Sequence, residues 1–585
     1  MTSEAPAAAR APLALAAAAA AAALPSLLAH STSPSPTFLN QALAFALWPA
    51  LLLVAEPRWR LRGALCLLAA LLLLMLAAVG SSVFGALPFP LGLSAIATLG
   101  AALLMTLGGS GLRARADAEP LFAAFCWGWI IAGAINIAIA LLQVFAPGLA
   151  DGEWLAASAY PGRAVGNLRQ PNHLSSLLLW HCIAVIALHE LGRLRRWFAA
   201  ALLALGVFAV VLTASRTGLV SVVLLAVWGV LDRRLSKPAR VLLCVAPVVY
   251  LVSWELMAKW ATLTQQAFGG SERLAETDIS SSRFAIWRDT LEMIRQQPWL
   301  GVGWGEFNFA WTLTPLPQRP VAFFDHTHNL PLQLAVELGL PLALLVLGLL
   351  VWALWQAASR AWRTDGALGA AQRCAVLMVV MIGLHSLLEY PLWYSYFLLP
   401  AAWVFGFALQ GDPQRATAAE APPVPPPAAP RLNVLVVAAL VTIGGAAMSV
   451  VDYWRVMVIF SPSDSGTSLE RRIAVGQRSV FFAHHADYAA VTSDIPQADP
   501  EHAFDRVPHY LLDTRLMMTW ARALAAQGRI DEARHLAARL REFRKPDAVE
   551  FFKDCPTAAQ APAPGLPFQC ELPQRRLTWR DFLRD

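Results

Sequence analysis

Residues 281–311 read SSRFAIWRDTLEMIRQQPWLGVGWGEFNFAW, and residues 323–339 read FFDHTHNLPLQLAVELG. Together they form the longest polar interruption in a chain that otherwise consists mainly of apolar segments. Arg, Asp and His side chains are concentrated here, where a water-exposed loop would return to a membrane. The stretch therefore predicts the exposed functional face of a membrane protein.

The composition of the whole chain is that of an integral membrane protein. Of its 585 residues, 57% are hydrophobic and only 14% are charged, whereas about 25% are charged in a typical soluble domain. The formal net charge of +6 comes mainly from short loops, so it indicates membrane topology and not nucleic-acid binding. We predict an all-α polytopic protein that has the lipid bilayer as its main partner.

About thirteen segments are apolar and long enough to cross a bilayer, which takes about 20 residues in a helix. The predicted spans are 12–28, 38–55, 63–80, 87–107, 121–145, 173–190, 198–214, 218–231, 240–258, 330–356, 372–390, 391–410 and 432–451. The first could also be a cleaved signal peptide, but more spans follow it, and we predict a first transmembrane helix.

Basic residues follow every second predicted span, as at Arg60, Arg113, Arg193, Arg234 and Arg360. The short loops between these positions are nearly free of Lys and Arg, and the positive-inside rule then puts the basic loops and the N-terminus in the cytoplasm. The loops 146–172, 215–217 and 259–329 would face outward, as would residues 452–585. In a bacterium with two membranes, this places the chain in the inner membrane and its outer loops in the periplasm.

Four regions follow from this topology. Residues 1–410 form a membrane domain, and 411–431 form a cytoplasmic Pro/Ala-rich linker that cannot pack a core. Residues 432–451 form the last span, and 452–585 form a small periplasmic helical domain. Within that domain, 516–543 show two amphipathic halves around a Gly-Arg turn, a pattern that resembles one tetratricopeptide helix-turn-helix unit. Cys555 and Cys570 would form a disulfide if this region lies in an oxidising compartment.

Two outward-facing stretches hold polar residues at the expected membrane surface. In GNLRQPNHLSS (166–176), Gln170, Asn172 and His173 precede a span. A helix cap with Pro171 at the helix start would explain part of this pattern, but not the gathering of so many polar side chains. In TASRTG (213–218), Arg216 is a lone outward Arg, which either extends to lipid head groups or grips a phosphate with its guanidinium fork.

The polar stretch itself begins with a predicted amphipathic helix. One face of it carries Phe284, Trp287, Leu291 and Ile294 at helical spacing, and Arg283 and Arg288 lie elsewhere on the helix. The pattern is typical of a helix lying on a membrane surface with ordinary basic residues. It also suits binding of an anionic lipid head group.

The residues before the tenth span could carry out proton transfer. His326 and His328 flank Thr327, but no third ligand of the usual kind is nearby, so we predict no metal. His328, with Asp325 close by, could act as a general base; the alternative is a His that caps a helix. At the last outer turn, Glu389 and Tyr390 could belong to an aromatic interface belt, although a belt explains the carboxylate poorly.

Several of these motifs occur in the order found in a known family. RQPNH, then SRTG, then SSRFAIW with PWLGVGWGEF, and then HTHN–x9–G before a span together resemble the O-antigen ligase and polymerase superfamily. QPNH, HTHN, EYPLWY and the extra C-terminal domain resemble in particular its bacterial protein O-oligosaccharyltransferases, the pilin-glycosylation ligase type. The resemblance covers roughly residues 160–400.

The resemblance implies a GT-C-like membrane fold and an activity. The activity is en bloc transfer of an oligosaccharide from undecaprenyl diphosphate to Ser or Thr of periplasmic or pilin proteins, without a metal or other cofactor. By motif, His328 matches the essential His, and Arg216 and Arg283 match Arg residues that hold the diphosphate. We add Arg288, which lies on the helix of Arg283, to the diphosphate-binding group.

The predicted substrate-binding residues complete the site. Gln170 and Tyr390 match polar residues of the protein-glycosylating branch, and the remaining candidates are Asn172, His173, Asp325, His326 and Glu389. Leu342 departs from the ligase pattern, which has Gly, Thr or Tyr there. Two alternatives keep the same fold: ligation to lipid A core, and polymerisation of repeat units. A transporter of lipid-linked sugars is a third, but it would place charged groups within the spans.

Overall fold

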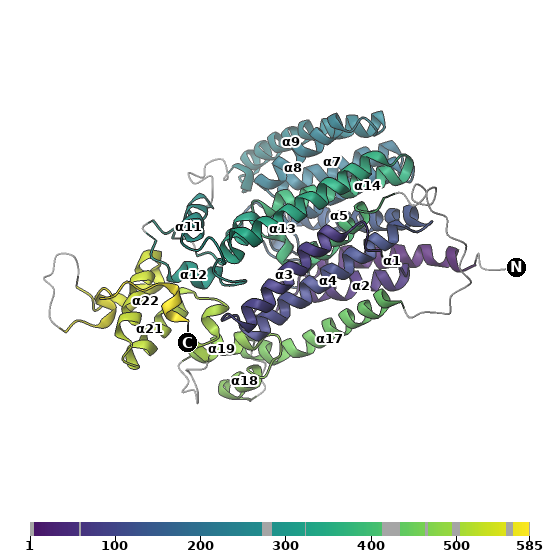
Figure 1. Cartoon of the computed structure of the whole chain (residues 1–585). Helices are drawn as coiled ribbons and strands as arrows, with labels where there is room; N and C mark the ends of the chain where they lie inside the picture. Colours follow the sequence, from purple (N-terminus) through teal and green to yellow (C-terminus); the bar gives the residue numbers. More distant parts are fainter. Residues whose placement is uncertain are drawn as a thin grey trace. The chain divides into compact units, whose positions relative to one another are not determined.

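The structure is a computed structural model that describes residues 5–57, 60–271, 283–316, 318–321, 323–411, 433–461, 466–493, 503–556 and 565–583. Within these ranges the chain forms α-helices and short 3-10 helices and no strand, which confirms the all-α class (Figure 1). The predicted linker 411–431 lies almost entirely outside the described residues. Contacts divide the chain into two compact units, which we describe separately.

The helices of the described residues include nine that are long and apolar enough to cross a membrane. They are α2 (Phe38–Ala55), α3 (Leu65–Val83), α4 (Phe89–Arg113), α5 (Ala118–Phe145), α6 (Pro171–Glu190), α9 (Lys237–Thr264), α13 (Leu330–Arg363), α14 (Gly366–Ser386) and α17 (Val434–Phe460). Four shorter apolar helical stretches are Pro12–Leu27 of α1 (Ala5–Leu27), α7 (Arg196–Leu212), α8 (Arg216–Leu231) and α15 (Ser395–Ala408). An apolar helix therefore lies at each predicted span, as expected for a multi-pass membrane protein.

Most predicted spans have somewhat different ends in the structure, and two of the differences matter here. α14 stops at Ser386 and not at 390, so Glu389 and Tyr390 lie in the segment between α14 and the 3-10 helix Pro391–Trp393. A residue that precedes a proline is disfavoured in helical geometry, which explains why Tyr390 leaves the helix. α17 continues to Phe460, nine residues beyond the predicted end at 451, and its last turns pack against α18 (Leu469–Gly476) and α19 (Ala483–Thr492).

The first unit comprises Met1–Leu71, Thr98–Thr277 and Gly348–Val450. Its core contains a set of stacked aromatic rings, in which Phe125 lies 4.5 Å from Trp403 and Phe122 lies 4.8 Å from Phe407. Gly109 of α4 faces this set, and a Cβ atom there would lie 2.0 Å from the Trp403 carbonyl oxygen. Small residues let apolar helices approach closely, which is how helices associate in lipid.

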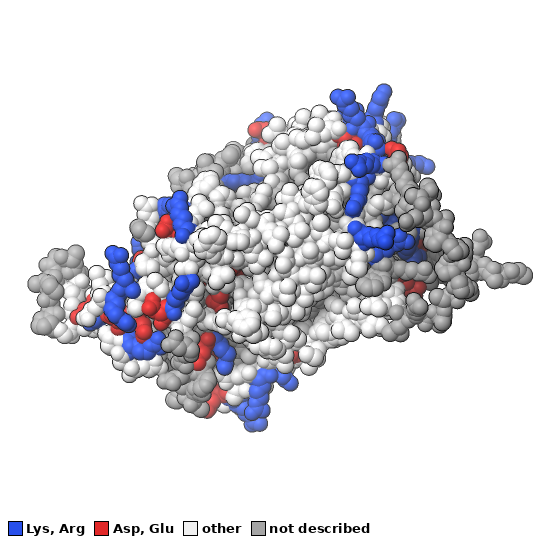
Figure 2. Space-filling view, viewed as in Figure 1, with Lys and Arg blue, Asp and Glu red and all other residues white. Residues whose placement is uncertain are grey.

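The surface of the apolar helices carries few charges. In the view of Figure 2, Lys and Arg side chains gather over the ends of helices such as α9 and α14, and the lengths of the helices are almost free of charged side chains. Large apolar side chains such as Leu76, Leu344 and Val441 are exposed along these lengths. An uncharged surface of this kind is expected of helices that face lipid.

The second unit comprises Leu72–Ala97, Asp278–Leu347 and Val451–Asp585. It contains α11 (Arg283–Gln296), α12 (Phe307–Leu313), α18, α19, α21 (Thr514–Ala526) and α22 (Ile530–Phe543). α21 and α22 pack against each other around Gly528, which has a φ of 80°. The predicted pair of amphipathic helices is therefore confirmed, whereas a repeat-like array and the predicted domain boundaries stay predictions.

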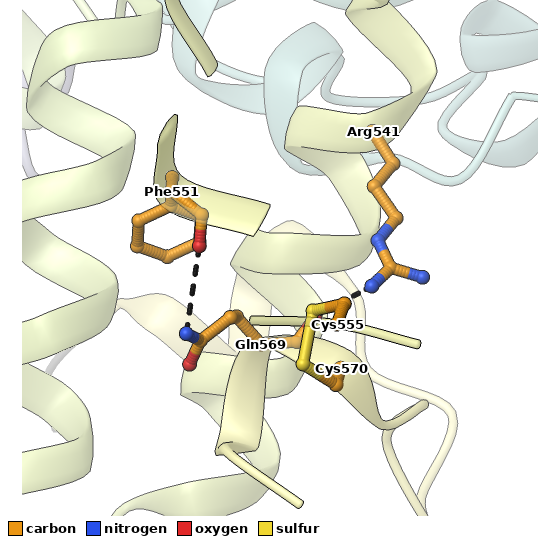
Figure 3. The surroundings of a disulfide bond; sticks show 5 residues. All are labelled: Arg541, Phe551, Cys555, Gln569 and Cys570. Carbon is orange, nitrogen blue, oxygen red and sulfur yellow. Dashed lines mark hydrogen bonds between the residues drawn. A yellow bond between two sulfur atoms is a disulfide. The ribbon is translucent and has the colours of Figure 1, made fainter. Parts of the chain in front are cut away.

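A disulfide closes the region after α22. Cys555 and Cys570 are bonded, as the sequence allowed. Next to the bond, the Arg541 guanidinium donates to the Gln569 carbonyl oxygen at 3.0 Å, and the Gln569 amide donates to the Phe551 carbonyl oxygen at 3.4 Å (Figure 3). The bond thus ties the irregular segment after 565 to the end of the helical hairpin.

Arg319 joins the segment after α12 to α22. Its side chain is fully buried, and its guanidinium pairs with the Glu542 carboxylate at 2.9 Å. The same guanidinium donates to the carbonyl oxygens of Trp311 (2.8 Å) and Thr314 (2.5 Å). It also lies 4.7 Å from the ring of Trp311 and 4.8 Å from that of Phe543. The Arg319 guanidinium therefore links α12 and the segment that follows it to α22.

Buried histidines make this region sensitive to acid. Burial lowers the pKa of His535 to about 4, and it lowers the pKa of His485 to about 3. His535 Nε2 lies 2.8 Å from the Leu313 carbonyl oxygen, so this nitrogen must carry the proton and donate it. A His with a lowered pKa in the folded state binds fewer protons than it does unfolded, so its folded-state stability is full above pH 6.5 and falls as the pH drops toward 4.

We expect α22 to open more readily in acid. As the pH falls from 6.5 toward 4, each buried imidazole with a lowered pKa should reduce the free energy of opening by about 1.4 kcal/mol per pH unit. Amide hydrogen exchange of α22 in the purified full chain, corrected for intrinsic exchange, measures this slope. His535→Gln can keep the bond to Leu313 without titrating and should lower the slope; an unchanged slope would show that His535 does not contribute.

Candidate functional site

The first group of candidate residues lies at the start of α6, in the first unit. Gln170 is the N-cap, and its side-chain oxygen accepts a hydrogen bond from the His173 amide at 2.7 Å. Pro171 occupies the first helical position, where its missing N–H costs nothing. The helix cap considered from the sequence is thus present at Gln170, and a role of Gln170 in substrate binding stays a prediction.

Asn172 joins three segments that are far apart in the sequence. Its side-chain oxygen accepts from the Ser215 hydroxyl at 2.6 Å, and its side-chain nitrogen donates to a Glu389 carboxylate oxygen at 3.1 Å. Ser215 is itself the N-cap of α8 and accepts from the Gly218 amide at 3.0 Å. The structure therefore brings QPNH, TASRTG and EYPLWY together, and Arg216 is the first residue of α8 beside this junction.

His173 lies among aromatic rings. Its side chain is 4% exposed, and its Nδ1 atom lies 3.1 Å from the Tyr396 hydroxyl. The ring of Tyr394 meets it edge-on at 4.5 Å, and Tyr390 in turn stacks on Tyr394 at 6.0 Å. Glu389 and Tyr390 thus belong to a packed polar and aromatic group inside the first unit.

Sequence reasoning missed several members of this group. They are Ser175, Ser215, His385, Tyr394 and Tyr396, of which His385 pairs with the Ser176 hydroxyl at 2.7 Å. All of them lie within or beside stretches that the sequence had marked. The sequence could have pointed to Ser215, because the Ser of SRTG stands just before a predicted span, where a helix N-cap is expected.

The second group lies in the second unit and begins with α11. Of the four residues predicted on its apolar face, only Ile294 is buried, and Phe284 and Leu291 are exposed. The side that packs on protein carries Ile286 and Thr290 instead. The predicted apolar face is therefore partly exposed, and an exposed apolar face can serve contact with lipid.

The two Arg residues of α11 differ in their surroundings. Arg283 is the first residue of the helix and is half-buried. Arg288 is exposed, and its guanidinium donates to both oxygens of Gln318, side chain and backbone, at 2.7 Å each. It also approaches the buried Asp289 carboxylate at 3.4 Å. Arg288 is thus held mainly by the loop that follows α12.

The HTHN stretch is a fixed turn. His326 Nδ1 lies 2.8 Å from an Asp325 carboxylate oxygen. The Trp287 indole donates to the Thr327 carbonyl oxygen at 2.9 Å, and the Thr327 amide donates to the Gln333 side chain at 2.8 Å. These bonds hold the turn between α11 and the start of α13.

His328 occupies an unusual backbone position in this turn. Its φ is 53°, in the left-handed region, and its ring meets Phe324 edge-on at 5.5 Å. The Asn329 side chain accepts from the Leu332 amide at 3.0 Å at the start of α13. A non-glycine residue with positive φ is uncommon and points to a constraint other than local preference.

α13 is broken where the sequence predicts one continuous span. Gly339 has φ 73° and ψ 162°, and Pro341 supplies no N–H. The carbonyl oxygens of Val336 and Glu337, left without their helical partners, accept from the amides of Val302 and Gly303 at 2.9 and 3.0 Å. The GVGWG segment (301–305) therefore supplies backbone N–H groups that pair with the carbonyl oxygens at the break in α13.

Among the described residues, no three His, Cys, Asp or Glu side chains gather as metal ligands would. The metal-independent transfer implied by the resemblance stays a prediction.

Three family models match parts of the chain. Residues 200–347 match an O-antigen ligase family, 164–189 match a protein glycosylation ligase, and 373–550 match the C-terminal part of a virulence factor membrane-bound polymerase. The first match contains SRTG and the stretch from Arg283 to Gly339, and the second contains RQPNH. They confirm the resemblance that the motifs indicated.

Two curated proteins of Acinetobacter baylyi are similar to the chain. A general O-oligosaccharyltransferase is 28% identical over 340 residues, which cover 55% of this chain and 57% of that protein. A ComP-specific O-oligosaccharyltransferase is 27% identical over 301 residues, which cover 51% and 53%. The chain thus spans between 53% and 57% of the length of these relatives.

Proposed function

We propose that this relative of the O-antigen ligases and protein glycosylation ligases is a glycosyltransferase that glycosylates proteins. It would transfer an oligosaccharide en bloc from undecaprenyl diphosphate to Ser or Thr hydroxyls of periplasmic or pilin proteins, without a metal. The observation that carries the proposal is the similarity to two O-oligosaccharyltransferases over as many as 340 residues.

We propose further that thirteen helices cross the bacterial inner membrane in a GT-C-like arrangement, with the N-terminus in the cytoplasm. Contacts in the first unit support the alternation of sides. Arg193 pairs with Glu119 at 3.1 Å and Arg234 pairs with Asp365 at 2.6 Å, and each pair joins two loops that the sequence assigns to the cytoplasm. Likewise, Asn172 contacts Ser215 and Glu389, which are all assigned to the outside.

Contacts in the second unit support a periplasmic C-terminal domain. The Trp304 amide donates to the Ser81 hydroxyl in the last turn of α3 at 2.8 Å, and the sequence assigns both positions to the outside. The Glu306 carboxylate lies 2.7 Å from His509 Nδ1, so the C-terminal residues share this side. A disulfide between Cys555 and Cys570 fits an oxidising compartment. A helical domain on this face would suit docking of an acceptor protein.

The chemistry needs a base and cations. As the acceptor hydroxyl attacks the anomeric carbon, the new C–O bond forms, the bond to the diphosphate breaks, and the electron pair leaves with the diphosphate. We assign His328 as the base that takes the hydroxyl proton. Arg216, Arg283 and Arg288 would stabilise the departing diphosphate by charge-assisted hydrogen bonds. Direct attack of this kind inverts the configuration at the sugar carbon.

The remaining candidates are assigned to substrate binding. They are Gln170, Asn172, His173, Asp325, His326, Glu389 and Tyr390. Asn172 and Glu389 fit this role because their hydrogen bonds to each other fix both side chains, and preorganised polar groups bind a polar substrate at lower entropic cost.

A second candidate function differs only in the acceptor. The matches to an O-antigen ligase and to a membrane-bound polymerase favour ligation to lipid A core or polymerisation of repeat units. The same base and cations would serve these reactions.

A transfer assay separates the two. Purified protein in chelator-treated buffer is mixed with lipid-linked oligosaccharide and either a pilin-like periplasmic protein or lipid A core. The proposal predicts glycan on Ser or Thr of the protein. Glycan found only on lipid A core would contradict it and establish a ligase.

A further inference from the structure

A cavity of about 330 Å³ lies within the second unit, apart from every residue assigned a role above. Its walls come from the α3–α4 loop, α12, the segment before α21, α21 itself and the last 3-10 helix, Trp579–Phe582. The volume is at the small end of the range of about 300–1,000 Å³ that ligand pockets occupy. It suits a piece of a larger ligand.

The cavity has rigid aromatic walls. Phe309, Trp520 and Phe582 are each less than 10% exposed, and the rings of Trp520 and Phe582 meet at 5.4 Å. His509 stacks on Phe309 at 4.3 Å, and its Nδ1 atom lies 2.7 Å from the buried Glu306 carboxylate. These contacts fix the rings, so the cavity is formed before any ligand arrives.

Polar side chains line the rest of the cavity and balance in charge. Asp505 supplies a carboxylate, Gln527 an amide, and Arg529 a guanidinium that also pairs with Glu532. A strongly anionic ligand such as a diphosphate would meet the Asp505 carboxylate. A purely apolar ligand would cover polar groups without hydrogen bonds, which costs free energy. The lining therefore favours a neutral ligand with both polar and apolar surface.

A sugar ring has this character, because its faces carry C–H groups and its edge carries hydroxyls. The exposed ring of Phe84 can cover one face, the buried rings of Trp520 and Phe582 form an apolar wall behind the cavity, and the side chains of Asp505, Gln527 and Arg529 match the hydroxyls. We propose that the cavity binds sugar rings of the oligosaccharide, an inference that rests on the proposed function. At the rim, Phe84 is 89% exposed and available to a ligand.

The test is a variant in which a larger side chain on one wall fills the cavity. Ala523 lines the cavity, whereas Ala526 lies on the same helix, is exposed and does not line it. The probe is the free oligosaccharide released by mild acid from the lipid-linked pool of the producing cells, and its Kd for the purified full chain is measured by saturation-transfer NMR. We expect Ala523→Trp to raise the Kd about tenfold or more, a loss of about 1.4 kcal/mol, and Ala526→Trp to leave it unchanged.

Phe84→Ala provides a second variant. Its ring is exposed, so its removal leaves the packed core of the second unit unchanged. It should raise the Kd several-fold. Absence of binding by the unaltered chain, or an unchanged Kd in both Ala523→Trp and Phe84→Ala, would overturn the proposal. A raised KM for the acceptor protein with an unchanged glycan Kd would assign the cavity to the acceptor and overturn it too.

The same variants separate this inference from the function on which it rests. If the unaltered chain fails to glycosylate protein, the proposed function fails, and the Kd of the free glycan still reports on the cavity. If transfer proceeds normally but Ala523→Trp leaves the Kd of the free glycan unchanged, only the assignment of the cavity fails.

Discussion

Replacing His328 by Ala is expected to lower the rate of glycan transfer by about a hundred- to ten-thousand-fold, the usual contribution of a positioned general base. A Ser or Thr hydroxyl is a poor nucleophile near neutral pH, and without a base its proton has no acceptor as the C–O bond forms. The measurement is the single-turnover rate at saturating lipid-linked donor. His328→Gln keeps a polar side chain but has no basic nitrogen, so it should be equally slow.

The fold of the HTHN turn serves as the control for this variant. Bonds of Trp287, Thr327 and Gln333 hold the turn, and amide exchange around Thr327 that matches the unaltered chain will show that the turn is intact in the variant. His189→Ala, a change of the same type in the last turn of α6 at the end assigned to the cytoplasm, should leave transfer intact. Normal transfer by His328→Ala would remove the assigned base.

Replacing Arg319 by Met is expected to destabilise the second unit by about 3–5 kcal/mol, the cost of breaking a buried ion pair by removing one partner. The loss leaves the Glu542 carboxylate and the carbonyl oxygens of Trp311 and Thr314 without their donor. It also removes the cation that lies against two aromatic rings. Amide exchange of α12 and α22 in the full chain should accelerate about a hundredfold or more.

Arg541→Ala is the matched control for Arg319, because it changes an exposed Arg on α22, the helix that carries Glu542. Its guanidinium contacts Gln569 and the ring of Phe552, so its loss should cost no more than about 1 kcal/mol. Equal exchange rates in the two variants would show that the buried pair does not secure α22. Arg319→Lys should restore little, since an ammonium cannot reproduce the planar fork of a guanidinium.

Local pattern was enough for the membrane helices. Burying a backbone in lipid requires a continuous helix about 20 residues long. Apolar length therefore placed an apolar helix at each predicted span, and nine of these helices in the described part of the chain are long enough to cross a membrane. The Gly-Arg turn and its flanking amphipathic halves predicted α21 and α22 for the same local reason. Cys555 and Cys570, the two cysteines in the polar C-terminal region, pointed to the disulfide.

Pattern was less informative where a residue has two possible environments. The apolar positions of α11 are visible in the sequence, but periodicity does not say whether such a face meets protein or lipid, and Phe284 is exposed. In the same way, Gly339 was seen as a motif residue, but the break in α13 depends on amides that come from Val302 and Gly303.

The sequence by itself determined the helical class and the positions of the apolar helices, and it supplied the candidate site residues, because these follow from composition and from spacing along one segment. Only the tertiary structure decided which of those residues meet. Asn172 binds Ser215 and Glu389, 43 and 217 residues away, and Arg319 binds Glu542, 223 residues away. The type of a polar residue does not identify its hydrogen-bond partner. The partner is fixed only when helices that are distant in the chain pack together.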